Sequence, residues 1–232
     1  MCYNDIVGIF GTEQVTLGTI FVGYRKRTRT EERKMKNNNT RSLVVTALFV
    51  ALILLLGLTP LGLIPLGFIN VTILCIPVVV GTIFLGLKTG MVLGACFGLV
   101  STLSAFNLSP LTPPSSLASA LVAQNPLLAI VMCMLPRLAV PVATYGVFKL
   151  MARGDAHSKA ALPFAAAAGS LCNTILYLGL MLLFYCITGL NSSTILALIG
   201  GTGLVAGISE AVVAAVVCTP VVYALWKAFH KA

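Results

Sequence analysis

The chain contains few charged residues and even fewer acidic ones. Aspartate, glutamate, lysine and arginine together make up 9% of its 232 residues, and only six residues are acidic. Hydrophobic residues account for 58%, and the mean hydropathy is +1.01. An ordinary soluble domain has about 25% charged residues. This composition therefore excludes a soluble domain and predicts a protein that crosses a lipid bilayer several times.

Residues that support catalysis or bind metals are also scarce. The seven cysteines include no Cys-x-x-Cys pair, and the two histidines, His157 and His230, fall outside the apolar runs. An intramembrane hydrolase would need a nucleophile with a base, or a cluster of metal ligands. Because the apolar runs contain no histidine and a single carboxylate, we predict that the protein is not an enzyme and holds no metal or other cofactor.

Six apolar runs are long enough to cross a hydrocarbon core, which takes about 20 helical residues, or about 17 at the short end. We therefore predict an all-α polytopic membrane protein, a bundle of six transmembrane helices. The two longest runs should tilt or extend beyond the membrane. The six runs are residues 42–58, 71–87, 90–106, 126–150, 162–188 and 195–225.

The lysine and arginine residues predict the orientation of this bundle. Eight of the fifteen fall between Arg25 and Arg41, just before the first run. Three of the connections, 59–70, 107–125 and 189–194, carry no charge and alternate with basic connections. Cytoplasmic flanks are enriched in lysine and arginine, so we predict that both termini are cytoplasmic. The net charge of +9 reflects this topology and does not indicate nucleic-acid binding.

The first 34 residues differ from the rest of the chain. Residues 7–24 are moderately apolar, but polar residues and glycines interrupt them, so they meet the requirements of a span poorly. Met35 stands just before the lead-in to the first run. We expect residues 1–34 to be a flexible or mis-annotated extension and residues 35–232 to form the membrane domain.

Glycines recur at every fourth position in and before the third run. Such a stripe lies on one side of a helix and lets a neighbouring helix approach closely. We expect it to pack inside the bundle and not against a partner protein. Ala47 and Ala51 form a similar but weaker pair in the first run. The glycines of the stripe are Gly86, Gly90, Gly94 and Gly98.

The outer segment after the first run, residues 59–72, is uncharged and apolar, with two prolines and two glycines. Loops exposed to water are seldom so apolar. Pro65 and Gly67 predict a turn, and the apolar side chains around them must avoid water. This connection is either a lid over a site in the outer half of the protein or an anchor lying among lipid headgroups.

Two charged residues, Arg137 and Glu210, lie near the middle of apolar runs. A charge at bilayer depth costs several kcal/mol unless it is paired or lines a cavity, so such residues mark pathways or binding sites. Counted from the outer ends of their runs, Arg137, Asn173 and Glu210 all lie about 18 to 23 Å deep. We predict that they share one polar site. The alternative is that Arg137 and Glu210 only neutralise each other as a structural ion pair.

Several distinct short segments, spread along nearly the whole chain after Met35, are informative together. They are IPLGFINVTILCIPVVVG at 64–81, GLKTG at 86–90, FGLVS at 97–101, NP at 125–126, PR at 136–137, GSLCNT at 169–174, and Glu210. Together these segments resemble the substrate-binding (S) subunits of energy-coupling factor (ECF) transporters. The later segments are similar to those of the pantothenate-type members.

This resemblance implies a six-helix membrane protein of a bacterial cell membrane that binds one water-soluble vitamin beneath its first outer loop. Such a subunit docks on a transmembrane coupling subunit that carries two cytoplasmic ATPases. Ala47 and Ala51 match an Ala-xxx-Ala pair by which the family contacts the coupling subunit. The expected vitamin is pantothenate, with folate-type or pyridoxine-type vitamins as alternatives. A self-sufficient secondary transporter is a further alternative, although we find no convincing inverted repeat.

Pantothenate has a carboxylate at one end and hydroxyl and amide groups along its length, and the polar residues of the later runs suit these groups. Arg137 would clamp the carboxylate through its two-pronged guanidinium. Asn173 and Thr174 would bond the amide and the hydroxyls. Tyr177, one turn along from Asn173, would add an aromatic wall and a phenol.

Two further polar residues complete the expected site. Glu210 would accept hydrogen bonds from ligand hydroxyls or hold Arg137 in place, and Asn70 adjoins the expected lid. The predicted substrate-binding set is therefore Arg137, Asn173, Thr174, Tyr177, Glu210 and Asn70.

Overall fold

The computed structural model divides the chain into two units, Met1–Val45 and Thr46–Ala232. The first unit is described only over residues 40–45, so the expected extension 1–34 and the start at Met35 lie outside the described residues. The described residues are 40–59, 63–65, 70–72, 74–108, 116–152, 158–189, 196–197, 201 and 203–230.

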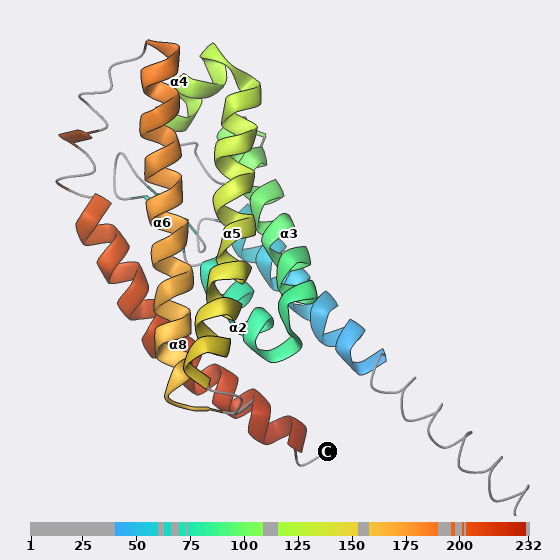
Figure 1. Ribbon diagram of the computed structural model, residues 1–232. Coiled ribbons are helices and arrows are strands. Elements are labelled where there is room, and N and C mark those ends of the chain that lie inside the picture. Colours follow the sequence, from blue (N-terminus) through green and yellow to red (C-terminus); the bar gives the residue numbers. More distant parts are fainter. Residues whose placement is uncertain are drawn as a thin grey trace, which may run out of the picture. The chain divides into compact units, whose positions relative to one another are not determined.

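Helices make up most of the described chain (Figure 1). Five of them are long and apolar enough to cross a membrane, which confirms the prediction of a helical, multi-pass membrane protein. These five are Thr40–Leu58, α3 (Leu87–Ala105), α5 (Pro126–Ala152), α6 (Ala161–Thr188) and α8 (Leu204–His230). Two shorter helices are α2 (Cys75–Leu85) and α4 (Ser116–Gln124).

The second predicted span, 71–87, contains a shorter helix than the sequence predicts. α2 has 11 residues, so it is about 16 Å long, whereas a hydrocarbon core is about 30 Å thick. Pro77 fits the first turn of α2, where its missing N–H has no intrahelical acceptor in any case. Gly86 ends the helix at a φ of 92°, which glycine adopts without strain. The count of six spanning helices stays a prediction.

Two short strands precede α2. β1 (Leu63–Pro65) and β2 (Asn70–Thr72) pair in the antiparallel sense, with Pro65 opposite Asn70. β2 lies beside α8, so the backbone of Asn70 is near that helix. Residues 66–69, which connect the strands, lie outside the described residues. The two expectations for this connection, a lid or an interfacial anchor, both stay predictions.

The last long helix begins later than the sequence predicts. The expected run starts at Ile195, whereas α8 starts at Leu204. Three of the four residues from 200 to 203 are glycines, which disfavour an α-helix, and Gly201 and Gly203 are π-helical. Glu210 therefore lies only six residues into α8 (210 − 204). The depth counted for Glu210 from Ile195 is wrong, and its place follows from its contacts.

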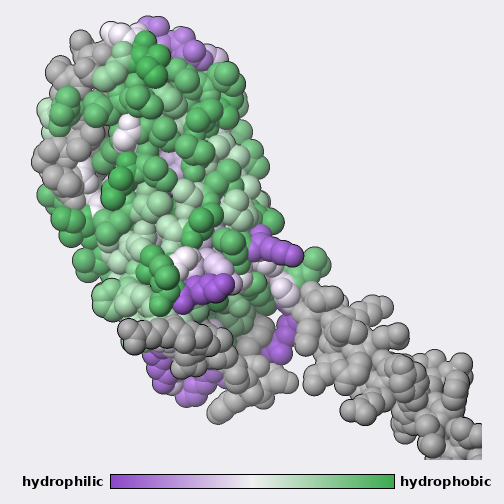
Figure 2. Space-filling model, viewed as in Figure 1, coloured by the Kyte–Doolittle hydropathy of each residue, from purple (hydrophilic) through white to green (hydrophobic). Residues whose placement is uncertain are grey.

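Within the unit Thr46–Ala232, the long helices pack side by side around α2. α5 lies between α3 and α6, and α6 lies between α5 and α8 (Figure 1). α2 contacts all four of these helices, and its Val78, Val79 and Val80 are fully buried. Figure 2 shows hydrophobic side chains over the middle of this body and hydrophilic ones towards its two ends. Such a surface suits the hydrocarbon region of a bilayer.

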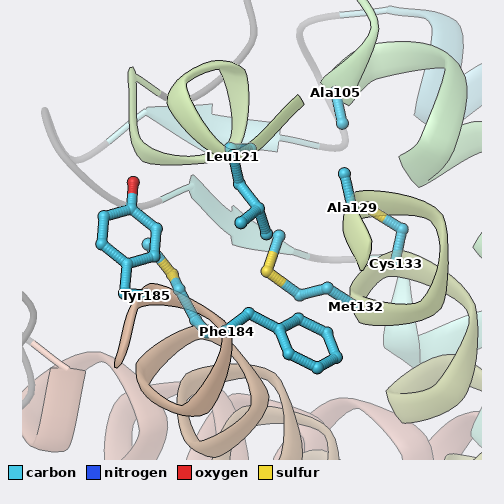
Figure 3. Packing of buried hydrophobic residues seen from close by; sticks show 9 residues of the cluster. Ala105, Leu121, Ala129, Met132, Cys133, Phe184 and Tyr185 are labelled. Atoms are coloured by element: carbon cyan, nitrogen blue, oxygen red, sulfur yellow. The ribbon is translucent and has the colours of Figure 1, made fainter. Parts of the chain in front are cut away.

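A second group of buried side chains joins α4 to the start of α5 and the end of α6. Leu121 of α4 faces Met132 of α5 and Phe184 of α6 (Figure 3). The hydroxyl of Tyr185 donates a hydrogen bond of 2.7 Å to the carbonyl of Leu117. Tyr177, which lies one turn before Met181 and almost two turns before Phe184 on α6, packs against the same group. α4 therefore closes this end of the bundle.

The glycine stripe lies at the contact between α3 and α5. A Cβ added at Gly90 or Gly94 would meet Pro141, and one added at Gly98 would meet Met134. These contacts confirm that the stripe packs inside the bundle, apart from Gly86, which has no such neighbour within 4 Å.

Replacing Gly94 with alanine is expected to lower the free energy of unfolding by about 1–3 kcal/mol, the usual cost of overpacking. The new Cβ would lie 2.7 Å from the backbone oxygen of Arg137. Gly146→Ala is the matched control, because a Cβ there meets nothing within 4 Å and alanine favours a helix by up to about 1 kcal/mol. Thermal unfolding of both variants in one detergent measures the difference. Equal melting temperatures would contradict the close contact at Gly94.

Candidate functional site

Arg137 lies inside the bundle, near the middle of α5, with 6% of its surface exposed. The preceding residue, Pro136, has no N–H, which leaves the carbonyl of Met132 without its helical donor. Nη1 of Arg137 donates a long hydrogen bond of 3.5 Å to this carbonyl. The Pro-Arg sequence thus provides both a buried cation and a backbone acceptor that holds it.

Two aromatic rings lie against the guanidinium. Its Cζ is 4.6 Å from the ring centroid of Tyr177 on α6 and 5.3 Å from that of Phe97 on α3. A cation–π contact stabilises a desolvated pair by about 2 kcal/mol, so both rings favour the inward position of Arg137. Its Nε is buried and has no hydrogen-bond partner among the described residues. One N–H donor is therefore available to a further acceptor.

Asn173 lies on the face of α6 that is turned towards α5. The two helices run antiparallel, with Arg137 against Tyr177 and, two turns away, Thr144 against Gly169. Asn173 is midway between Gly169 and Tyr177, hence on the same side of α6. Its side chain is 4% exposed, and its Oδ1 has no partner in the described part of the chain. The contact between α5 and α6 thus holds a buried donor and a buried acceptor that are both unpaired within that part.

Thr174 lies on the neighbouring face of α6, towards α8. Its hydroxyl is 3.0 Å from Oε2 of Glu210 and 3.3 Å from the carbonyl of Ser170, and its single proton can be donated to either. α8 approaches closely here because Gly207 faces Thr174, where an added Cβ would lie 3.0 Å from the threonine methyl group. The structure therefore brings Thr174 and Glu210 together, as well as Arg137 and Tyr177.

Two neighbours of these residues were not predicted from the sequence. Phe97 and Cys75, the first residue of α2, were expected only as parts of family segments. The buried thiol of Cys75 lies within electrostatic range of both Glu210 and Arg137. The start of α2 is therefore near both charged residues, but no spacing pattern in the sequence relates Cys75 or Phe97 to them.

The remaining predicted residues lie apart from this group. The backbone of Asn70 belongs to β2, beside α8, and its side chain lies outside the described residues. Ala47 and Ala51 are exposed on the helix Thr40–Leu58, so they line the surface of the protein and not the polar site.

A bundle of long apolar helices that holds an arginine, a glutamate and an asparagine at its internal contacts is typical of membrane proteins that handle a polar solute. Comparison with known proteins identifies the family. The model of the family "ECF transporter, substrate-specific component" matches residues 41–223, so the chain belongs to this family.

The chain is also similar to the pantothenic acid transporter PanT of Lactococcus lactis subsp. cremoris (strain MG1363). The two are 28% identical over 204 residues, which cover 84% of this chain and 98% of the lactococcal protein. The matched family consists of transporter components, and the lactococcal relative is named as a transporter.

Proposed function

We propose that this substrate-specific component binds pantothenate. Its lactococcal relative is named as a pantothenic acid transporter. The observation that carries the proposal is a pair of buried atoms at one helix contact, Nε of Arg137 and Oδ1 of Asn173, that have no hydrogen-bond partner among the described residues. Buried polar atoms are nearly always hydrogen-bonded. A ligand with a carboxylate for the guanidinium and a hydroxyl or amide N–H for the asparagine satisfies both.

Each polar residue then has a role that suits its place. Arg137 binds the carboxylate while Tyr177 and Phe97 hold the guanidinium between their rings. Asn173 accepts a hydrogen bond from an amide N–H or a hydroxyl of the ligand. Thr174 and Glu210, which already contact each other, bind the hydroxyls at the far end.

The first outer connection completes this proposal. With β2 beside α8, Asn70 at the start of β2 is near the helix that carries Glu210, and its amide is a further ligand contact. The connection would then act as the lid over the bound vitamin, and not as an interfacial anchor.

The proposal extends to topology and partners. The protein crosses a bacterial cell membrane six times with both termini in the cytoplasm, and it works with a transmembrane coupling subunit and two ATPases, as membership of the family implies. Ala47 and Ala51 lie exposed beside exposed leucines such as Leu48 and Leu52. Small residues on a bulky face let another helix approach, which supports these alanines as the contact with the coupling subunit.

A calorimetric titration of the purified protein tests the ligand. We expect one pantothenate bound per chain and no heat of binding from folate or pyridoxine. Pyridoxine has no carboxylate for Arg137, and folate has a second carboxylate for which the described residues hold no second buried cation. Binding of either of these vitamins in place of pantothenate would overturn the assignment. Proteoliposomes that contain this chain alone should accumulate no pantothenate; uptake without partners would identify a secondary transporter instead.

A further inference from the structure

The turn before α6 and the last turns of α8 bring two lysines close to an exposed tyrosine. Nζ of Lys159 lies 4.5 Å from the ring centroid of Tyr223, and Lys227 follows Tyr223 by one turn of α8. Both lysines are exposed, and Tyr223 is 44% exposed. Glu210 is the one carboxylate among the described residues, and it lies near the opposite end of α8. Neither lysine has an anion beside it in that part of the chain.

A stripe of exposed apolar side chains on α8 leads to these lysines. Val205, Val212, Val216 and Tyr223 follow one another at intervals of seven, four and seven residues, which places them on one face of the helix. The three valines are 68%, 56% and 66% exposed. The stripe thus runs along most of α8 and ends at the charged group.

Aromatic residues mark the level at which this stripe meets the membrane surface. Trp226, next to Lys227, packs on Phe148 of α5 with ring centroids 6.4 Å apart. Tryptophan and tyrosine are enriched where the hydrocarbon core meets water, so Tyr223 and Trp226 place the two lysines at the depth of the lipid headgroups.

We propose that this place binds one anionic phospholipid, of the phosphatidylglycerol type. The phosphate lies between the ammonium groups of Lys159 and Lys227, the glycerol region meets the hydroxyl of Tyr223, and an acyl chain follows the valine stripe. Charge complementarity selects this occupant, because a basic group between membrane helices attracts an anionic headgroup. The ammonium group of a phosphatidylcholine would instead meet two like charges. This site is separate from the substrate site and does not depend on the identity of the vitamin.

Trp226, the single tryptophan of the chain, reports on this place directly. The protein is reconstituted in vesicles of phosphatidylcholine with a fixed fraction of phosphatidylglycerol, and the acyl chains of one or the other lipid are brominated. Brominated chains quench tryptophan fluorescence at short range. We expect phosphatidylglycerol to occupy the place near Trp226 at least about fivefold more readily than its mole fraction predicts, which corresponds to about 1 kcal/mol for one lysine near a membrane surface.

In the variant Lys159→Gln/Lys227→Gln, the ratio of phosphatidylglycerol occupancy to its mole fraction should fall to about one. Its matched control, Lys88→Gln/Lys149→Gln, removes the same charge from exposed lysines of other helices and should retain the preference. Quenching by each lipid in proportion to its mole fraction, in the unchanged protein, would overturn the proposal. So would an equal loss in both double variants, which would indicate attraction to the overall basic surface and not to this site.

Discussion

The variant Arg137→Ala should bind pantothenate more weakly by about 2–5 kcal/mol, or roughly thirtyfold to several thousandfold in Kd. Truncation leaves the ligand carboxylate buried without its charged partner, and it removes a guanidinium that can bond both carboxylate oxygens at once. The side chain is already held inward by Met132, Tyr177 and Phe97, so the unchanged protein loses little side-chain freedom on binding. Calorimetric titration of both proteins measures the difference.

Panthenol, in which a primary alcohol replaces the carboxylate, separates this contact from general damage to the bundle. Arg137→Ala should weaken the binding of panthenol far less than that of pantothenate, because the alcohol makes no ion pair. Arg137→Lys should lie between the unchanged protein and the alanine variant, since an ammonium keeps the charge but not the two-pronged geometry. An equal loss for both ligands would reject Arg137 as the carboxylate clamp.

The long helices of the bundle could be predicted because their ends carry local signals. α5 begins at Pro126, and a proline fits the first position of a helix. α6 ends at Thr188 and is followed by Gly189 with a φ of 70°, the usual glycine cap. α2 and α8 were misplaced because hydropathy alone does not distinguish a helix from an apolar strand or from a glycine-rich connection. Their true starts depend on the β1–β2 pair and on the glycines at 200–203.

The candidate site could be predicted in its residues but not in its contacts. The spacing of Asn173 and Tyr177 already places them on one face of α6, and a lone arginine in an apolar run must point inwards. Phe97 contacts Arg137 only because α3 packs against α5 at this point. The carbonyl of Met132 is available to Arg137 because Pro136, in the same helix, has no N–H. Thr174 meets Glu210 even though the depth counted for Glu210 was wrong, because α8 approaches α6 at Gly207.

Asn173→Leu should change ligand binding and ligand-free stability in opposite directions. Leucine has nearly the shape of asparagine, but it removes Oδ1, which is buried without a partner in the described chain. An unsatisfied buried polar atom costs about 1–3 kcal/mol, so the ligand-free variant should unfold at a temperature at least as high as the unchanged protein. In the complex the same change leaves a ligand donor unsatisfied. Pantothenate should therefore bind about fivefold to a hundredfold more weakly, by the same range of energies.

Thr144→Val provides the control for this inverse relation. Oγ1 of Thr144 is likewise buried without a partner among the described residues, and valine has the same shape. Thr144 packs against Gly169, two turns away from Arg137, so its replacement should raise the stability of the ligand-free protein and leave the affinity for pantothenate unchanged. Thermal unfolding without ligand and calorimetry with ligand give the two quantities for each variant. Both variants remove a buried polar oxygen that has no partner among the described residues, but at different places. If Asn173→Leu kept its affinity for pantothenate, Oδ1 of Asn173 would not be a ligand contact. The same would follow if Thr144→Val lost as much affinity as Asn173→Leu.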